Sequence, residues 1–456
     1  DDTLEGTPDF QGLTADCYWM HVRVEQMTFR RRHLFRDGVP WRYEGVIHEY
    51  PVCEAAHSDA YLEGDYFIVG RHLGARGLDP ESYRRDGELL LAQVQSNPDD
   101  AHSVFFLAQC YEYFGDHANA RAWRARHIEM GDADEMIYFS MLKLGVAMDK
   151  LGEPWAEVQD VYLRAWALRP SRAESLEMIA FHYVQAQQPE LGYLFASRAA
   201  QIPLPATDTV NVFPSVYQWL AADEQAFCAA SIGCNAEALS IWRRLLAGDN
   251  VPDDDRVRMI TNRDVVAAQL REECATFPVD LVCRPAGRVD AEVTVRIVAG
   301  PDRGVTEATL NSFLRCCTDV ARVGRFVIVD AGLSEADRAE LTGLYPFVEL
   351  ASGDGRLGGR YVLELRQGWR FFTEEALISR LVGVLESEPQ LSAVGVNFGD
   401  ATELTTESPA RSGVRTAATG GRYVLTAVDP QGPVMIDTSR GGDKFASLDE
   451  VLCVRG

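Results

Sequence analysis

The sequence predicts a multidomain chain, with α/β parts at its two ends and an all-α part between them. Three observations support this prediction. The 456 residues suffice for several domains of about 150 residues each. The middle of the chain reads as helix after helix, and from about residue 290 strand and helix patterns alternate. We place the three parts at residues 1–75, 80–275 and 288–456, with a linker indicated by two prolines and a glycine within 277–287.

Composition excludes several classes of protein. Hydrophobic residues make up 46% and charged residues 25%, as in folded proteins. The net charge of −24 disfavours a nucleic-acid partner, because phosphate contacts need cations. No apolar stretch approaches the ~20 residues of a transmembrane helix. The ten cysteines form no CxxC pair, so we expect neither a zinc ribbon nor a disulfide scaffold but a cytoplasmic protein.

The N-terminal part combines cations with a His-Glu pair. A strand pattern over 17–24 is followed by Arg30-Arg31-Arg32, and a second strand pattern from Trp41 ends at His48-Glu49. Arginine grips phosphate oxygens in a fork, imidazole binds divalent ions, and a carboxylate can accept a proton. A structural His-Glu pair and a solvated arginine face are the alternatives.

The middle part is repetitive. Pro98 and Pro170 lie 72 residues apart, close to two units of about 34 residues, and small residues recur where paired helices would touch. This pattern resembles tetratricopeptide repeats, although Arg124 stands where an aromatic residue is usual. A generic helical bundle is the alternative. In either case we expect this part to bind a protein partner or to act as a spacer.

The C-terminal part predicts parallel β-strands joined by helices. Strands are expected at 293–298, 325–330 and 347–350, with helices between them. Asp330 would stand at the carboxyl end of the second strand, where ligands of such sheets bind. A Rossmann-like domain with another function would give the same pattern.

The N-terminal part also resembles the C-terminal half of a family 2 glycosyltransferase with the GT-A fold. The resemblance rests on Asp1-Asp2-Thr3-Leu4-Glu5, His33-Leu34-Phe35-Arg36 and Tyr43-Glu44-Gly45-Val46-Ile47-His48-Glu49. It implies a metal-dependent, bacterial-type hexosyltransferase whose upstream half is missing. It also implies a divalent metal (Mn or Mg), a nucleotide-diphosphate sugar donor and a peptide, lipid-linked or glycan acceptor. The implied roles are metal binding by Asp1 and His48, general-base catalysis by Glu49, and phosphate or acceptor contacts by Arg32, Arg36 and Arg42.

The C-terminal part resembles a second, altered GT-A domain. Val329 to Ser334 is similar to the family's nucleotide-binding turn, which implies that Asp330 contacts the nucleotide. Tyr361 to Phe372 is similar to the segment Leu-Glu-Asp-Asp-Trp-x-Phe, but the acids are replaced by Arg366, Gln367 and Gly368. Because divalent ions need anionic oxygen ligands, we expect no metal-bound nucleotide sugar here. Glu364 should face away from Leu363 and Leu365 and is a weak substitute.

The sequence therefore leaves two functions. The first is glycosyl transfer by a longer protein of which this chain is a fragment, with the helical repeats holding part of the acceptor. The second is a non-catalytic tetratricopeptide-type scaffold or interaction protein with inactive glycosyltransferase-like ends.

Overall fold

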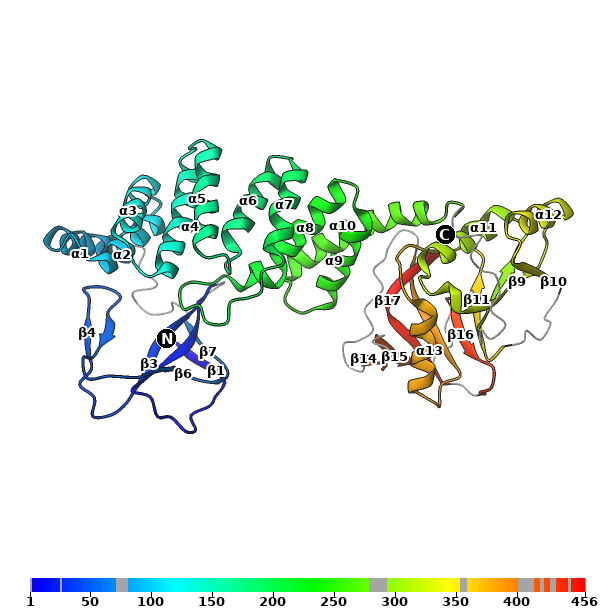
Figure 1. Cartoon of the computed structure of the whole chain (residues 1–456), viewed down its shortest axis with the longest axis horizontal. Helices are drawn as coiled ribbons and strands as arrows, with labels where there is room; N and C mark the ends of the chain where they lie inside the picture. The colour runs from blue at the N-terminus through cyan, green and yellow to red at the C-terminus, as the bar shows by residue number, and fades with distance from the viewer. Residues whose placement is uncertain are drawn as a thin grey trace. The chain divides into compact units, whose positions relative to one another are not determined.

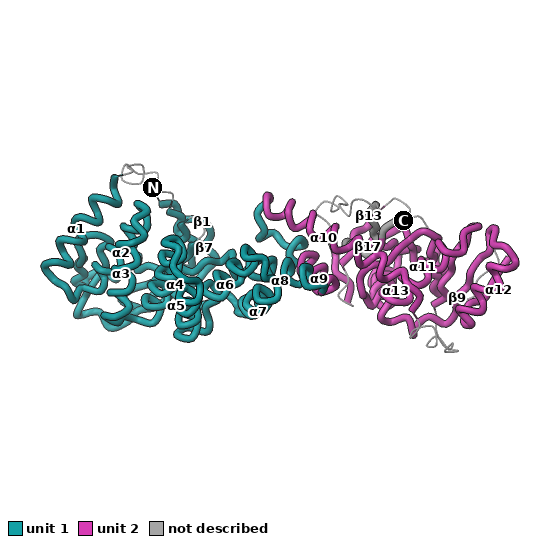
Figure 2. Tube along the Cα trace, turned by 90° about the horizontal axis from the view of Figure 1, so that it is seen from above, with its two compact units in different colours: residues 1–233, 244–252 teal, residues 234–243, 253–456 magenta. Residues whose placement is uncertain are grey.

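The computed structural model describes residues 2–24, 27–70, 81–278, 293–352, 359–400, 414–418, 422–426, 432–441 and 444–455. The chain forms two compact units, one of residues 1–233 with 244–252 and one of residues 234–243 with 253–456 (Figure 2). None of the described helices combines the length and apolar character needed to cross a bilayer.

The first unit begins with a five-stranded sheet. Its members are β1 (Thr3–Pro8), β2 (Cys17–Val24), β3 (Met27–Phe35), β6 (Asp59–Tyr61) and β7 (Gly64–Gly70). The order is β1-β7-β2-β3, and β6 extends β7 along β2. β2 runs parallel to β7 and antiparallel to β3, and its buried residues Tyr18 and Met20 pack on Leu62 and Tyr66. A separate antiparallel pair, β4 (Arg42–Glu44) with β5 (Tyr50–Val52), lies outside this sheet.

Helices follow one another from residue 82 onward (Figure 1), and in the first unit each packs against the next. In the first unit they are α1 (Ser82–Ser96), α2 (Ala101–Tyr113), α3 (His117–Met130), α4 (Asp134–Lys150), α5 (Trp155–Leu168), α6 (Glu174–Gln185), α7 (Pro189–Ala199), the π-helical turn η1 (Val216–Leu220) and α8 (Ala221–Ser231). The chain continues into α9 (Asn235–Ala247) and α10 (Asp253–Cys274). The predicted helical repeats are therefore present.

A left-handed residue recurs at the same place in each helix pair. Gly115, Gly152 and Gly233 have φ angles of 76°, 72° and 85°. Each is the second residue after the end of a helix, α2, α4 or α8. Gln187 takes this position after α6, with φ of 56°. The left-handed conformation turns the chain sharply after a helix, and glycine adopts it without strain. The recurring turn indicates that the helix pairs α2–α3, α4–α5 and α6–α7 are copies of one repeated unit.

Small residues allow paired helices to pack closely. A Cβ atom on Gly145 of α4 would lie 2.7 Å from Cζ of Tyr162 of α5, and one on Gly192 of α7 would lie 2.8 Å from Sγ of Cys228. Arg124, in the position expected for an aromatic residue, is fully buried between the ring of Phe105 and the carboxylate of Glu112. Its guanidinium thus fills the aromatic position while remaining paired.

The second unit contains a ten-stranded mixed sheet. Its strands are β8 (Val293–Ala299), β9 (Val323–Asp330), β10 (Val348–Ser352), β11 (Tyr361–Arg366), β12 (Trp369–Phe371), β13 (Ala393–Asp400), β14 (Val414–Thr416), β15 (Arg422–Thr426), β16 (Val434–Asp437) and β17 (Phe445–Arg455). The order is β10-β9-β8-β11-β16-β13-β17-β15-β14, and β12 also pairs with β17. The first four are parallel, which confirms the predicted parallel strands, and β16 is antiparallel to both of its neighbours.

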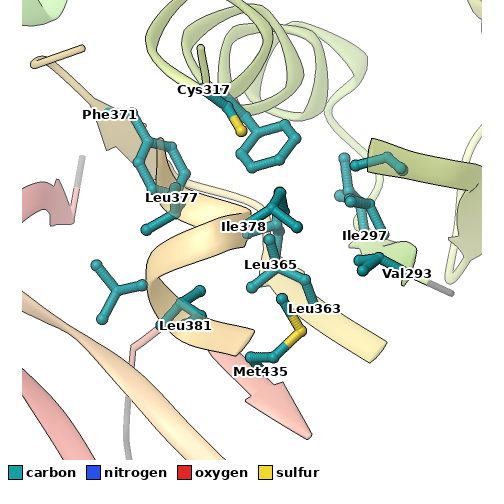
Figure 3. Packing of buried hydrophobic residues seen from close by; sticks show 14 of the residues in the cluster. Val293, Ile297, Cys317, Leu363, Leu365, Phe371, Leu377, Ile378, Leu381 and Met435 are labelled. Carbon is teal, nitrogen blue, oxygen red and sulfur yellow. The ribbon is translucent and has the colours of Figure 1, made fainter. Parts of the chain in front are cut away.

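Helices pack on this sheet through one apolar core. The helices are α11 (Arg303–Cys316), α12 (Glu335–Leu344) and α13 (Leu377–Ser387), with a 3₁₀ turn η2 (Val320–Arg322). Figure 3 shows Leu377, Ile378 and Leu381 of α13 facing Leu363 and Leu365 of β11. Glu364 is not in this core and pairs with Arg296 of β8, as the strand alternation predicts.

Candidate functional site

His48 and Glu49 lie in the loop between β4 and β5. β4 ends at Glu44, and both Gly45 and His48 have positive φ angles, of 108° and 53°, which an extended strand does not adopt. The prediction of a strand that ends at the His-Glu pair is therefore wrong. Both residues of the pair are exposed.

The backbone of this loop is fixed by its contact with α2. Ile47 is 8% exposed and belongs to an apolar cluster with Leu90 and Leu107. The His48 ring stacks on Phe106 with centroids 4.1 Å apart and planes at 18°. His102 Nε2 lies 3.1 Å from the carbonyl oxygen of His48. The neutral ring can donate to this oxygen when its proton is on Nε2. Burial lowers the pKa of His102 and so favours that neutral form.

The described surroundings of His48 do not fit a divalent-metal site. Mn²⁺ and Mg²⁺ need several oxygen ligands, and nowhere in the described parts of the chain do three or more His, Cys, Asp or Glu side chains form a group that could hold a metal ion. Asp1, the other predicted ligand, lies outside the described residues. His48 stacks on an aromatic ring, and no reaction step through a metal follows from this geometry.

The three arginines predicted to bind phosphate each have a different carboxylate partner. Arg32 also lies over the Trp19 ring, 4.7 Å from its centroid. The pairs are Arg32 with Asp59, Arg36 with Asp16 at 3.4 Å, and Arg42 with Glu44 at 2.9 Å and with Glu54 at 3.5 Å. Each of these arginines thus has intramolecular carboxylate partners of its own.

The segment 206–213, which follows α7, joins the N-terminal sheet to the first helices of the repeats. Thr28 of β3 exchanges two backbone hydrogen bonds of 2.8 Å with Val212, and the backbone N–H of Arg30 donates to Thr209. Glu135 of α4 accepts hydrogen bonds from the backbone N–H groups of Thr209 and Val210, at 2.7 and 3.0 Å. Part of α4 is therefore covered by the chain itself.

A buried ionic network anchors the same segment. Arg172, fully buried between α5 and α6, donates to Glu174 at 2.8 Å, to Asp208 at 3.2 Å and to the carbonyl of Asn211 at 2.9 Å. The hydroxyl of Tyr217 donates to Glu174 at 2.7 Å. Sequence reasoning missed this network. The feature of the sequence that could have indicated it is the group of arginines and acids around the α5–α6 turn, because a junction between two helices is expected to be buried.

Two phenylalanines are exposed at equivalent positions of the repeats. Phe181 of α6 and Phe227 of α8 are 46% and 39% exposed, and each lies six residues before the left-handed turn residue, Gln187 or Gly233. Each follows a fully buried alanine. α6 packs directly against α8, so the two positions lie on neighbouring helices. We call this pair the Phe181–Phe227 surface.

Asp330 ends β9 at the carboxyl edge of the parallel strands, where the sequence predicts it. Its Oδ1 accepts hydrogen bonds from the backbone N–H groups of Gly332 and Leu333 at 2.9 and 2.8 Å, and its Oδ2 accepts one from Arg338. These backbone bonds, and then the guanidinium, lower the pKa of Asp330. The loop backbone therefore binds one carboxylate oxygen, and Arg338 of α12 binds the other.

Gln367 fills the carboxyl edge between β8 and β11. Its Oε1 accepts a 2.7 Å hydrogen bond from the backbone N–H of Gly300, directly after β8. A Cβ on Gly300 would lie 2.8 Å from Cδ of Gln367, so the glycine is what allows the amide to sit there. This is the point at which strand order reverses in the parallel part of the sheet, the usual ligand position of such sheets.

No model of a known protein family matches the sequence, and no curated protein matches it. Among solved structures, the crystal structure of MamA is 14% identical, covers 36% of this chain and 88% of its own, and gives a TM-score of 0.31. YrrB, described as a TPR protein with an unusual peptide-binding site, is 18% identical over 40% of this chain and 84% of its own, with a TM-score of 0.31. TTC0263, a thermophilic TPR protein of Thermus thermophilus, is 16% identical over 40% of this chain and 90% of its own, with a TM-score of 0.29. At such TM-scores the likeness is partial, and the repeats are defined by the helices and turns of this chain.

Proposed function

We propose that this chain is a non-catalytic interaction protein whose helical repeats bind an extended apolar peptide segment. The observation that carries this proposal is the Phe181–Phe227 surface, in which two exposed aromatic side chains occupy equivalent positions on α6 and α8. Large aromatic residues dominate the energetics of protein interfaces because they bury much area with little loss of side-chain entropy.

The position of the surface limits what can bind there. Segment 206–213 already contacts α4 and the α5–α6 turn. A partner can therefore contact the exposed parts of α6 and α8, but not the whole repeat array. An extended segment with two apolar side chains fits the recurrence of one phenylalanine on each of these helices.

Selection of displayed random peptides on the whole chain, followed by fluorescence titration of the enriched peptides, tests this function. Phe181→Glu and Phe227→Glu should each weaken the enriched peptides at least tenfold. Leu89→Glu, at a 54% exposed position of α1, is the matched control and should leave the affinity unchanged. If enriched peptides bind the two variants as tightly as the unaltered chain, the proposal is wrong.

A second candidate function is glycosyl transfer, favoured by one feature of the second unit. The parallel strands β10-β9-β8-β11 place Asp330 at the carboxyl end of β9, close to the point where strand order reverses and where ligands of such sheets bind. Gln367 and Arg366 weigh against it, because neither supplies an anionic metal ligand. The test is calorimetric titration of UDP-glucose and GDP-mannose with Mn²⁺ present. Binding that Asp330→Asn abolishes would support this candidate, and absence of heat for both would exclude these two donors.

A further inference from the structure

A cavity of about 360 Å³ opens in the N-terminal sheet, at the end of β3 and beside the loop before β2. It lies within the usual range for small-molecule sites, roughly 300–1,000 Å³. Seven residues line it, and three of them are aliphatic and two aromatic: Leu13, Thr14, Ala15, Tyr18, Leu34, Phe35 and Arg36. The lining is thus more apolar than polar, it is open to solvent on one side, and Arg36 is the one cation among these residues.

The guanidinium of Arg36 has hydrogen-bonding capacity left for a ligand. It is 60% exposed, and its ion pair with Asp16 is long, at 3.4 Å. Asp16 does not depend on that pair, because its carboxylate also accepts from the His57 backbone N–H at 2.9 Å and from the Ser58 hydroxyl at 3.1 Å. These bonds, led by the backbone one, lower the pKa of Asp16. A guanidinium carries five N–H donors, and among the described residues Asp16 accepts from one of those of Arg36.

The apolar wall is held in place before any ligand arrives. The Tyr18 hydroxyl accepts hydrogen bonds from the backbone N–H groups of Thr14 and Ala15, at 2.6 and 2.9 Å, which fixes the loop on one side of the cavity. On the other side the Phe35 ring packs on Trp41 with centroids 5.0 Å apart. A fixed wall reduces the entropy lost when a ligand binds.

We propose that this cavity binds an apolar ligand that carries a single carboxylate. A carboxylate matches the fork of one guanidinium in two parallel hydrogen bonds. A diphosphate carries more charge than this site can balance, since Arg36 is the one cation among the residues lining the cavity and Asp16 offsets part of its charge. The ligand's body lies against Leu13, Leu34 and Phe35. This inference concerns the N-terminal sheet and does not depend on the Phe181–Phe227 surface.

Titration of the whole chain with hydrocinnamate, followed by ligand-observed NMR and calorimetry, tests the proposal. Hydrocinnamamide is the neutral analogue of the same shape and should bind at least tenfold more weakly. Arg36→Gln should remove this preference for the acid. Arg84→Gln makes the same change of charge at an arginine of α1 that is likewise 60% exposed and does not line the cavity, and it should leave both affinities unchanged. Leu13→Ser should weaken acid and amide together, because it removes apolar wall.

Two further probes identify the source of the carboxylate. Tighter binding of N-acetylphenylalanine would assign the ligand to peptide C-termini, and tighter binding of octanoate would assign it to free fatty acids; both results support the proposal. Equal affinity for hydrocinnamate and its amide, loss of the preference in Arg84→Gln, or no binding of either probe would overturn it. A thermal unfolding curve for each variant separates a lost site from a lost fold.

Discussion

Glu177 is a carboxyl group held almost entirely out of water on α6. It is 7% exposed, and the charge of Glu174 lies near it. Burial, and then this neighbouring charge, raises the pKa of Glu177 from 4.5 to about 8. The folded protein therefore keeps a proton on Glu177 that the unfolded chain releases at lower pH. A buried charge next to another acid costs free energy unless it is neutralised.

This single residue predicts a pH dependence of stability. Because the folded-state pKa is raised, the folded state binds more protons than the unfolded state between about 4.5 and 8, and stability falls as pH rises through that window. Glu177→Gln removes the titrating group. The variant should match the unaltered chain at about pH 4.5 and exceed it by on the order of 1–3 kcal/mol at about pH 8.5.

Urea unfolding of the repeats, followed by far-ultraviolet circular dichroism at both pH values, measures this difference. Glu129→Gln, at an exposed position of α3, is the control and should change the free energy of unfolding by less than about 0.5 kcal/mol at either pH. An advantage of Glu177→Gln that is the same at the two pH values would contradict the assignment of the proton.

At the scale of elements, the crossing of α4 and α5 depends on Gly145. The Tyr162 ring is 1% exposed and lies over this glycine, so it has no free space to move into. Gly145→Ala gains up to about 1 kcal/mol of helix propensity. It also forces the helices or the ring to shift, which typically costs about 1–3 kcal/mol. We therefore expect a net loss of stability, measured as a lower thermal midpoint of the helical repeats.

Two variants separate crowding from propensity. Gly343→Ala in α12 has nothing within 4 Å of the added Cβ, so it should leave stability equal or raise it. Tyr162→Leu shortens the crowding side chain, and the double variant Gly145→Ala/Tyr162→Leu should be more stable than the sum of the single changes predicts. A Gly145→Ala chain more stable than the unaltered one would show that the two helices separate at little cost.

Elements could be predicted from the sequence where the signal is local. Apolar spacing predicted the helices over 80–275, and buried runs of β-branched residues predicted β8 and β9. The loop at His48 could not be predicted in this way, because its course is set by the burial of Ile47 against α2. The Gln367–Gly300 contact likewise joins residues 67 positions apart. The glycosyltransferase roles of Glu49, Arg42 and Asp330 stay predictions.

At the scale of the whole molecule, the repeats of the first unit are partly covered by their own chain. The β4–β5 loop contacts α2, and segment 206–213 links β3 to α4. The candidate sites therefore divide between two surfaces, the cavity at Arg36 and the Phe181–Phe227 surface. A sequence motif drew attention to His48 and Glu49, because a motif records residue types. It could not show that the neighbouring Ile47 is the residue of this loop that is buried.

Adjacent residues of the β4–β5 loop provide a test of this covering. Ile47 is 8% exposed and Val46 is 45% exposed, so the same change to aspartate places a charge in the α2 contact in one variant and in water in the other. Burying an unpaired carboxylate is costly, and the loop should therefore leave α2 in Ile47→Asp. Hydrogen exchange read by mass spectrometry should then show faster exchange in residues 42–52 and 101–113 for Ile47→Asp, and unchanged exchange for Val46→Asp. Equal protection in both variants would mean that the His48–Phe106 stack and the His102 hydrogen bond hold the loop without Ile47. Faster exchange along all of 82–231 would mean that Ile47 supports the whole repeat array.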